Sequence, residues 1–213
     1  GGVKAVNSFG SLSLSDCTGN ITAQNSYAGL ELSNCSGTIS AVNAYAPISI
    51  SDSRGSVDVR NTGEISITDH IGPVSISNQY GSVTVSDVKG DVSIQNAYQE
   101  ISVENIDGKV QLENNYSPIS VSGITGAARL VNRFSSISGD DIAGPFDISS
   151  QNGEVEFALG HVVSGPCIIN SSFGTVRLEV PRALNLLIAA RTSNGDISSS
   201  FPIERTTSGF NKS

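Results

Sequence analysis

The chain has 213 residues and a net charge of −8, with 20 acidic against 12 basic residues. The acidic balance argues against nucleic acid and anionic membranes as partners, because both bind through clustered basic side chains. No run of about 18 apolar residues is present, so no membrane-spanning segment is expected, and the length suffices for one sizeable core.

An asparagine recurs every 18 residues along most of the chain, with a single interval of 17. Most of these asparagines open the triplet Asn-x-Tyr or Asn-x-Phe. A repeat this regular is typical of a chain that winds one supersecondary unit again and again, so that each turn buries its apolar face against its neighbours. The repeated residues are Asn7, Asn25, Asn43, Asn61, Asn78, Asn96, Asn114 and Asn132.

Each repeat contains two halves of nine residues, as in 81–89 and 90–98. In each half two apolar residues flank a polar one, which is the period-two pattern of a half-buried strand, and Gly with Asp or Asn marks the corners. In chain order the pattern predicts strands that contain residues 12–14, 30–32, 48–50, 57–59, 65–67, 74–76, 83–85, 92–94, 101–103, 110–112 and 119–121.

Two strands and two corners make one coil, so the predicted fold class is all-β, a single-stranded, right-handed parallel β-helix or β-solenoid. Strands one coil apart pair in parallel at about 4.8 Å. The right hand follows from the rule for parallel crossover connections. Counting the repeats predicts roughly eleven coils of about 18 residues.

The repeat runs almost end to end, so a single domain over residues 1–213 is predicted. Regular coils are expected over 1–152, longer irregular coils over 153–200 and a C-terminal tail over 201–213. The last intervals lengthen to 21 residues, which predicts protruding loops within 159–163 and 180–185.

The first residues already fit the second-strand pattern through Val3 and Ala5. The chain is therefore expected to start inside a coil and to present an open parallel edge. Such an edge allows copies to associate end to end.

Coils in register stack equivalent residues into columns, of which the Asn column is the first. It is interpreted as structural, since Asn tolerates a left-handed corner and its amide can bond the next Asn or the turn backbone. The coil from Asn61 is one residue short, which predicts a local pinch over 61–64.

An aromatic column follows the asparagines at a distance of two residues. Its rings are expected to cap one narrow edge of the core; the alternative is an exposed row that resembles a carbohydrate platform. The coil from Asn61 lacks its ring. The aromatic residues are Phe9, Tyr27, Tyr45, Tyr80, Tyr98, Tyr116 and Phe134, with Phe173 beyond them.

A third column lies at the opposite corner and includes three consecutive acidic residues. Neighbouring carboxylates repel, and each is expected to accept N–H bonds from its own turn. Calcium is the alternative, but the Gly-Gly-x-Gly-x-Asp motif of calcium-loaded β-rolls is missing, so no metal or cofactor is predicted. The column is Asp16, Asn34, Asp52, Asp69, Asp87, Asn105, Gly123 and Asp141.

Three cysteines are too few for a disulfide scaffold. Cys17 and Cys35 occupy equivalent positions in adjacent coils, where Val88 and Ile106 appear later, so both are expected in the core. Whether the two form a bond stays open, because their spacing suits a disulfide and their parallel side chains do not. Cys167 is expected to be apolar filler.

No catalytic pairing is predicted from the titratable residues. His70 and His161 are several coils apart and cannot share a metal or a proton relay. The acidic pairs at 140–141 and 154–156 would suit glycosidase carboxylates. The tight corners leave no groove walled by loops, so a polysaccharide-active enzyme remains only an alternative.

Hydroxyl groups dominate the outward positions of the first strand of each coil. Flat Ser/Thr-rich sheets predict a non-enzymatic binding scaffold or adhesin with a glycan or a surface protein as partner. The alternative is a structural spacer or self-associating module without a ligand. These outward residues are Ser13, Glu31, Ser49, Ser66, Thr84, Ser102, Ser120 and Ser138.

Residues 78–94 read Asn-x-Tyr-Gly-x-Val-x-Val-x-Asp-Val-x-Gly-x-Val-x-Ile. This pattern resembles the bacterial adhesin-like family of β-strand-repeat proteins, a domain of unknown function, and segments 177–181, 190–197 and 201–202 look like the end of that family. The resemblance covers nearly the whole chain. It implies a β-helix and an extracytoplasmic setting, at the cell surface or in the periplasm, but no catalytic or binding residues.

Overall fold

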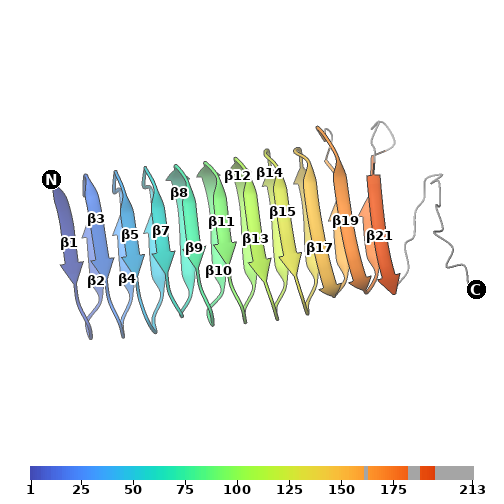
Figure 1. Cartoon of the computed structure of the whole chain (residues 1–213). Helices are drawn as coiled ribbons and strands as arrows, with labels where there is room; N and C mark the ends of the chain where they lie inside the picture. The colour runs from blue at the N-terminus through green and yellow to red at the C-terminus, as the bar shows by residue number, and fades with distance from the viewer. Residues whose placement is uncertain (161–162, 182–187, 195–213) are drawn as a thin grey trace, which may run out of the picture.

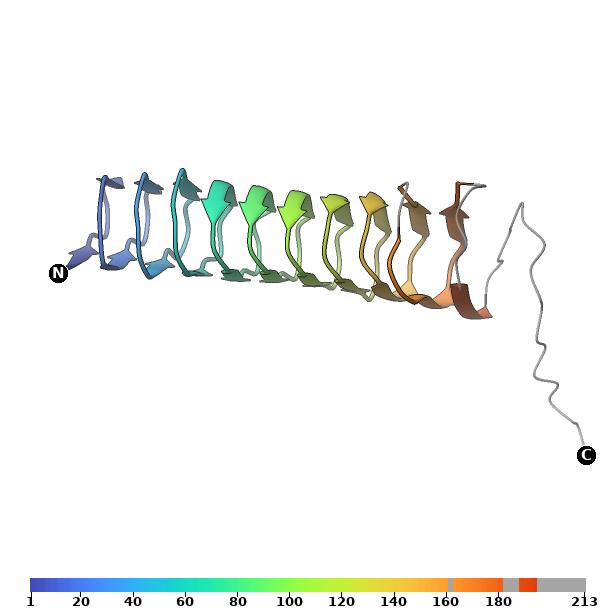
Figure 2. The same ribbon diagram turned by 90° about the horizontal axis from the view of Figure 1, so that it is seen from above.

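The computed structural model describes residues 1–160, 163–181 and 188–194, and all regular elements in these ranges are β-strands. The chain advances one coil at a time along a single axis (Figure 1). Two parallel sheets result, one from the odd-numbered and one from the even-numbered strands. They face each other across a narrow interior (Figure 2). The predicted all-β parallel solenoid is therefore confirmed.

Within the described ranges, sheet A has eleven strands and sheet B has ten. Sheet A consists of β1 (Gly2–Val6), β3 (Asn20–Gln24), β5 (Ile39–Val42), β7 (Val57–Arg60), β9 (Val74–Ser77), β11 (Val92–Gln95), β13 (Val110–Asn114), β15 (Ala128–Asn132), β17 (Phe146–Asn152), β19 (Cys167–Phe173) and β21 (Ile188–Asn194). Sheet B consists of β2 (Leu12–Ser15), β4 (Leu30–Ser33), β6 (Ile48–Ser51), β8 (Ile65–Ile71), β10 (Val83–Lys89), β12 (Ile101–Asp107), β14 (Ile119–Ile124), β16 (Ile137–Ile142), β18 (Val155–Ala158) and β20 (Val176–Glu179).

The core is a double row of aliphatic side chains that point inward from both sheets. Val83 and Val85 of β10 are fully buried, while Thr84 between them is exposed, as the period-two pattern predicts. Every predicted core residue from coil two onward is buried. Leu12 and Leu14 are only half-buried, because β2 has a described neighbour on one side alone.

Register explains both irregularities of the repeat. Paired strands are offset by 18 residues, as between Val83 and Ile101, but Ile48 pairs with Ile65 at an offset of 17. The missing residue falls at 61–64, where a Cβ on Gly63 would lie 2.8 Å from the Ala46 carbonyl oxygen. The offset confirms the short coil, whereas the pinch stays a prediction, because a Cβ on Gly153 of a regular coil would lie closer still, 2.0 Å from the Ser135 carbonyl oxygen.

Farther along, the offset rises to 21 residues, from Phe146 to Cys167 and from Cys167 to Ile188. The predicted loops at 159–163 and 180–185 lie partly, and the 201–213 tail wholly, outside the described residues. Across the three described ranges, no helix is long and apolar enough to cross a membrane.

Candidate functional site

The Asn column is buried at one corner of the solenoid, where it bonds backbone carbonyls. Asn114 is fully buried, and its Nδ2 donates to the Ser117 oxygen at 2.9 Å and to the Gln99 oxygen, one coil back, at 2.8 Å. Asn96 repeats the arrangement with Gln99 at 2.8 Å and Gly81 at 2.9 Å. The amides thus join successive turns through the backbone rather than through one another, which gives the buried ladder a structural role.

The left-handed corner was assigned to the wrong column. Positive φ values occur at the opposite corner, from Asp16 (φ 54°) to Asp141 (φ 48°), because Asp and Asn tolerate this conformation there. The expected bonds from each turn to its own carboxylate are absent from the described hydrogen bonds of this column. Instead Asn105 Nδ2 donates to Asp87 Oδ1 at 3.1 Å, and Asn34 donates to Asp16 in the same way. Interleaved amides therefore relieve part of the carboxylate repulsion.

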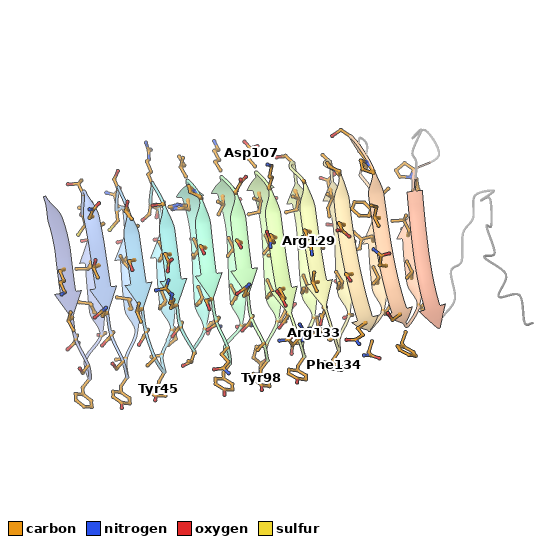
Figure 3. The ribbon with its side chains drawn as sticks, in the orientation of Figure 1. Tyr45, Tyr98, Asp107, Arg129, Arg133 and Phe134 are labelled. Atoms are coloured by element: carbon orange, nitrogen blue, oxygen red, sulfur yellow. The ribbon has the colours of Figure 1, made fainter. Side chains whose placement is uncertain are left out.

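The aromatic column points into solvent, so the prediction that it caps the core is wrong. Its rings range from 44% exposed at Tyr98 to 81% at Phe9. Tyr45, Tyr98 and Phe134 project from the same edge of the ribbon (Figure 3). The buried Asn already closes this edge of the core, and the turn after it carries the ring outward.

The rings stack on one another in two rows. Neighbouring centroids are 5.1–5.2 Å apart and the planes are within 15° of parallel. A sugar stacks on an aromatic face, but inside these rows the faces are already used by neighbouring rings. The rows are Phe9–Tyr27–Tyr45 and Tyr80–Tyr98–Tyr116–Phe134, separated by the short coil at 61–64.

Polar side chains point into the interior at the corner that follows the sheet B strands, directly after the residues of the Asp column, in four successive coils. Cys35 is buried and free, and Cys17 is half-buried and free. Ser53 continues the column, and its Oγ donates to the Ser51 carbonyl at 2.7 Å and accepts from the Cys35 amide at 3.1 Å. His70 follows, paired in register with Val88. Burial raises the pKa of the Cys35 thiol, which keeps it protonated and unreactive.

His70 was not predicted to belong to this column. The signal was present, since His70 follows Asp69 as Cys17 follows Asp16. His161, the other histidine, lies outside the described residues.

His70 is a fully buried neutral imidazole. Its Nε2 lies 2.8 Å from the Gly55 carbonyl oxygen, which can only accept, so Nε2 carries the proton. Nδ1 is then a buried acceptor that has no hydrogen-bond partner. Burial lowers the pKa of His70, and the Gly55 and Ser53 carbonyls oppose this only in part.

Acidification is therefore expected to destabilise the solenoid through His70. Because its pKa is lower in the folded than in the unfolded chain, the unfolded chain binds more protons below pH of about 6.5, and stability falls as the pH drops. The slope approaches about 1.4 kcal/mol per pH unit between the two pKa values. Urea unfolding of wild type and His70→Val between pH 7.5 and 5 measures it; identical pH profiles would contradict the assignment.

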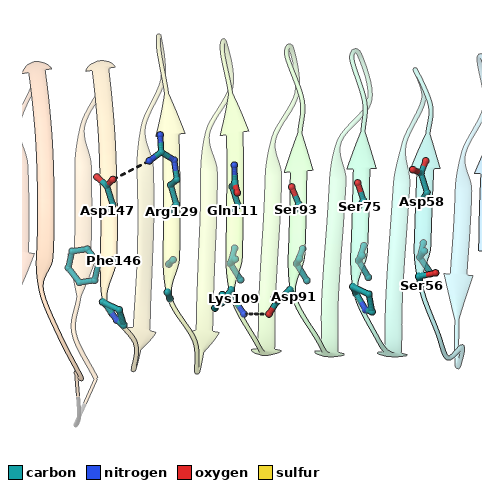
Figure 4. Close-up of a pocket in the computed structure, with 18 of the residues that line it drawn as sticks. Ser56, Asp58, Ser75, Asp91, Ser93, Lys109, Gln111, Arg129, Phe146 and Asp147 are labelled. Atoms are coloured by element: carbon teal, nitrogen blue, oxygen red, sulfur yellow. Dashed lines mark hydrogen bonds and ion pairs between the residues drawn. The ribbon is translucent and has the colours of Figure 1, made fainter.

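A shallow groove of about 850 Å³ runs across the outer face of sheet A, from β5 to β19. Two columns line it (Figure 4). One holds the outward residue of each strand, with the short Ser75 and Ser93 at the centre; the other holds the residues before the strands, including Pro73 and Pro145. At the strand spacing, eight strands span about 34 Å. The groove is therefore long, open and built on rigid strands.

The groove is close to electroneutral. Asp58, Asp91 and Asp147 oppose Lys109 and Arg129, which leaves one net negative charge. Arg129 also pairs with Asp147 at 3.3 Å, and the Asp91 carboxylate accepts the Lys109 backbone N–H at 2.9 Å. Most of the exposed groove surface is apolar, from residues such as Pro73 and Pro145, and Ser75, Ser93 and Gln111 add hydroxyl and amide groups at the centre. The groove therefore suits a ligand without net charge that has both apolar faces and hydroxyl groups.

The predicted hydroxyl surface lies on the other sheet. Its residues on sheet B are exposed or half-buried, as their outward positions require, but the groove lies on sheet A. One residue of each acidic pair considered for catalysis has a structural role: Asp141 takes the left-handed corner, and Glu156 pairs with Arg177 at 3.2 Å. In the part of the chain that is described, no group of three His, Cys, Asp or Glu side chains could hold a metal ion.

The comparisons with known proteins agree with the repeat architecture. No curated protein and no solved structure matches the sequence. The model of the family described as Toastrack DUF4097, a domain of unknown function, matches residues 19–213. This match confirms the expected β-strand-repeat family. Because it covers most of the solenoid, the chain belongs to the Toastrack DUF4097 family.

Proposed function

We propose that this domain is a non-enzymatic binding scaffold of the bacterial cell envelope that holds an extended, uncharged glycan along the groove of sheet A. The groove itself carries the proposal. It presents the same strand geometry once per coil, so it suits a ligand that is itself a linear repeat.

The spacing of the coils and the net charge of the chain indicate the class of ligand. A polypeptide advances about 3.3 Å per residue and drifts out of step with coils about 4.8 Å apart. A nucleic acid is disfavoured by the net charge of −8. A sugar in an extended chain is close to one strand spacing long, and its hydroxyl groups can bond Ser75, Ser93 and Gln111, which are exposed in the groove.

Blocking the groove is expected to abolish binding. Ser93→Trp places a large ring at its centre, while Thr84→Trp places the same ring at an exposed position of sheet B. Affinity electrophoresis against purified envelope and plant polysaccharides identifies a ligand for wild type. Ser93→Trp should weaken that binding at least about tenfold, a loss of 1.4 kcal/mol, and Thr84→Trp should not.

Two results would overturn the proposal. Equal affinity of the two tryptophan variants would place the ligand elsewhere. An absence of binding across the panel would favour the spacer without a ligand, and light scattering would then show whether copies self-associate.

A further inference from the structure

The aromatic column is interrupted where the coil is one residue short. Thr62 and Gly63 stand in place of Ala44, Tyr45 and Ala46 of the previous coil, so no ring is present between Tyr45 and Tyr80. The rings on either side keep the column's stacked geometry with their other neighbours, at 5.2 Å and 5.1 Å. The interruption is thus a vacant position in an otherwise regular stack.

The dimensions of the gap match one ring. Tyr45 and Tyr80 belong to coils that are two strand spacings apart, about 10 Å. A planar ring placed midway would lie about 5 Å from each, which is the spacing of the column and within the range of aromatic pairs. Nothing wider than one ring fits without moving the tyrosines.

Among the described aromatic pairs, Tyr45 stacks on Tyr27 alone and Tyr80 on Tyr98 alone. Tyr45 is 69% exposed, against 58% for Tyr27, which has a ring on both faces. Tyr80 is 57% exposed, close to the 54% of Tyr116, which has a ring on both faces. The exposed fraction therefore indicates an open face at Tyr45, while at Tyr80 the vacant position follows from the missing ring alone.

The second interruption of the column is different and serves as an internal comparison. Asn152 occupies the position between Phe134 and Phe173, pairs in register with Phe173, and donates its Nδ2 to the Arg133 carbonyl at 3.3 Å. The Asn152 side chain therefore occupies the column position in that coil. The coil at 61–64 lacks the residue that would occupy the equivalent position.

We propose that the gap between Tyr45 and Tyr80 is a binding slot for a single aromatic side chain of a partner polypeptide. The ring enters edge-on and completes the column. The polypeptide on either side of it packs along the exposed rows Phe9–Tyr45 and Tyr80–Phe134, which offer an apolar strip on each side of the gap. This site is separate from the groove of sheet A and does not depend on the proposed function.

The five tyrosines of the chain are all in the column, so selective ¹³C-tyrosine labelling gives one set of signals per ring. Titration with N-acetyl-tryptophanamide is expected to shift the Tyr45 and Tyr80 signals in a saturable way and to leave Tyr27, Tyr98 and Tyr116 unchanged. N-acetyl-leucinamide, which has the same backbone without a planar ring, should shift none of them.

Restoring the missing residue supplies the matched variant. Replacement of Thr62 by Ala-Tyr recreates the Asn-Ala-Tyr of the previous coil and fills the slot from within. This variant should no longer respond to N-acetyl-tryptophanamide, while unchanged Tyr27 and Tyr116 signals report an intact column.

Equal shifts of all five tyrosines, continued binding by the filled variant, or no shift up to the solubility limit would each overturn the slot. If free indole binds as tightly as N-acetyl-tryptophanamide, the slot recognises the ring alone, and the proposal that the ring belongs to a polypeptide would be wrong.

Discussion

Replacing Asn114 with alanine is expected to lower the free energy of unfolding by about 2–4 kcal/mol. The amide is fully buried and holds the Gln99 and Ser117 carbonyls at 2.8 Å and 2.9 Å, and its Oδ1 accepts from the Asn115 amide at 2.9 Å. Alanine removes all three bonds and leaves the Asn115 N–H without its acceptor, while the Gln99 and Ser117 carbonyls keep one donor each, Asn96 and Asn132. An unsatisfied buried polar group costs more than its hydrogen bond contributed.

Urea unfolding followed by far-ultraviolet circular dichroism measures the effect, with the midpoint moving and the slope constant. Asn114→Ser is the matched control, because Ser150 occupies the equivalent position and donates to the Gly153 carbonyl at 3.2 Å. Serine should recover part of the loss. If the two variants are equally unstable, the carbonyl bonds do not account for the column.

The solenoid could be predicted from the sequence because its determinants are one-dimensional. Alternation such as Val83-Thr84-Val85 assigns the inward side of a strand, and the constant 18-residue offset stacks equal positions whatever the exact path of the corner. Core membership follows directly from these two facts. Even the short coil at 61–64 was visible as a change of interval.

The corners could not be predicted because their direction depends on backbone dihedral angles. Asn and Asp both tolerate positive φ, so composition alone does not say whether Asn96 or Asp87 adopts it. The aromatic prediction failed for the same reason, since Tyr98 points out only because of the turn that follows Asn96. The groove of sheet A was invisible to the sequence, because it combines residues from eight strands.

Within the buried corner column, the sequence located the cysteines but not Ser53 or His70. Polar residue types at those positions contradict the apolar pattern of Val88 and Ile106, and a search for apolar columns passes over them. Their cost is offset by fixed carbonyl acceptors, the Ser51 oxygen for Ser53 and the Gly55 oxygen for His70.

Replacing Gly37 with alanine is expected to destabilise the solenoid by about 3 kcal/mol or more. Gly37 has a φ of 128°, which a side chain rarely adopts, and a Cβ there would lie 2.2 Å from the Gly19 carbonyl oxygen and 2.8 Å from its carbon. Both obstacles are backbone atoms of the neighbouring coil, so relief requires the coils to separate. Separation in turn lengthens parallel hydrogen bonds such as Gly37 N–H to the Arg54 oxygen, at 2.8 Å.

The same clash recurs in each coil at this corner. A Cβ on the corner glycine would lie 2.0–2.3 Å from the carbonyl oxygen of the equivalent glycine in the coil before. These corner glycines are Gly19, Gly37, Gly55, Gly72, Gly90, Gly108, Gly126 and Gly144. Gly29→Ala is the matched control, because its nearest neighbour would be 4.0 Å away and the change should stay within about 0.5 kcal/mol. Thermal and urea unfolding compare the two variants. Equal stability of Gly37→Ala and Gly29→Ala would mean that the coils can move apart at little cost, and glycine would then not set the pitch of the solenoid.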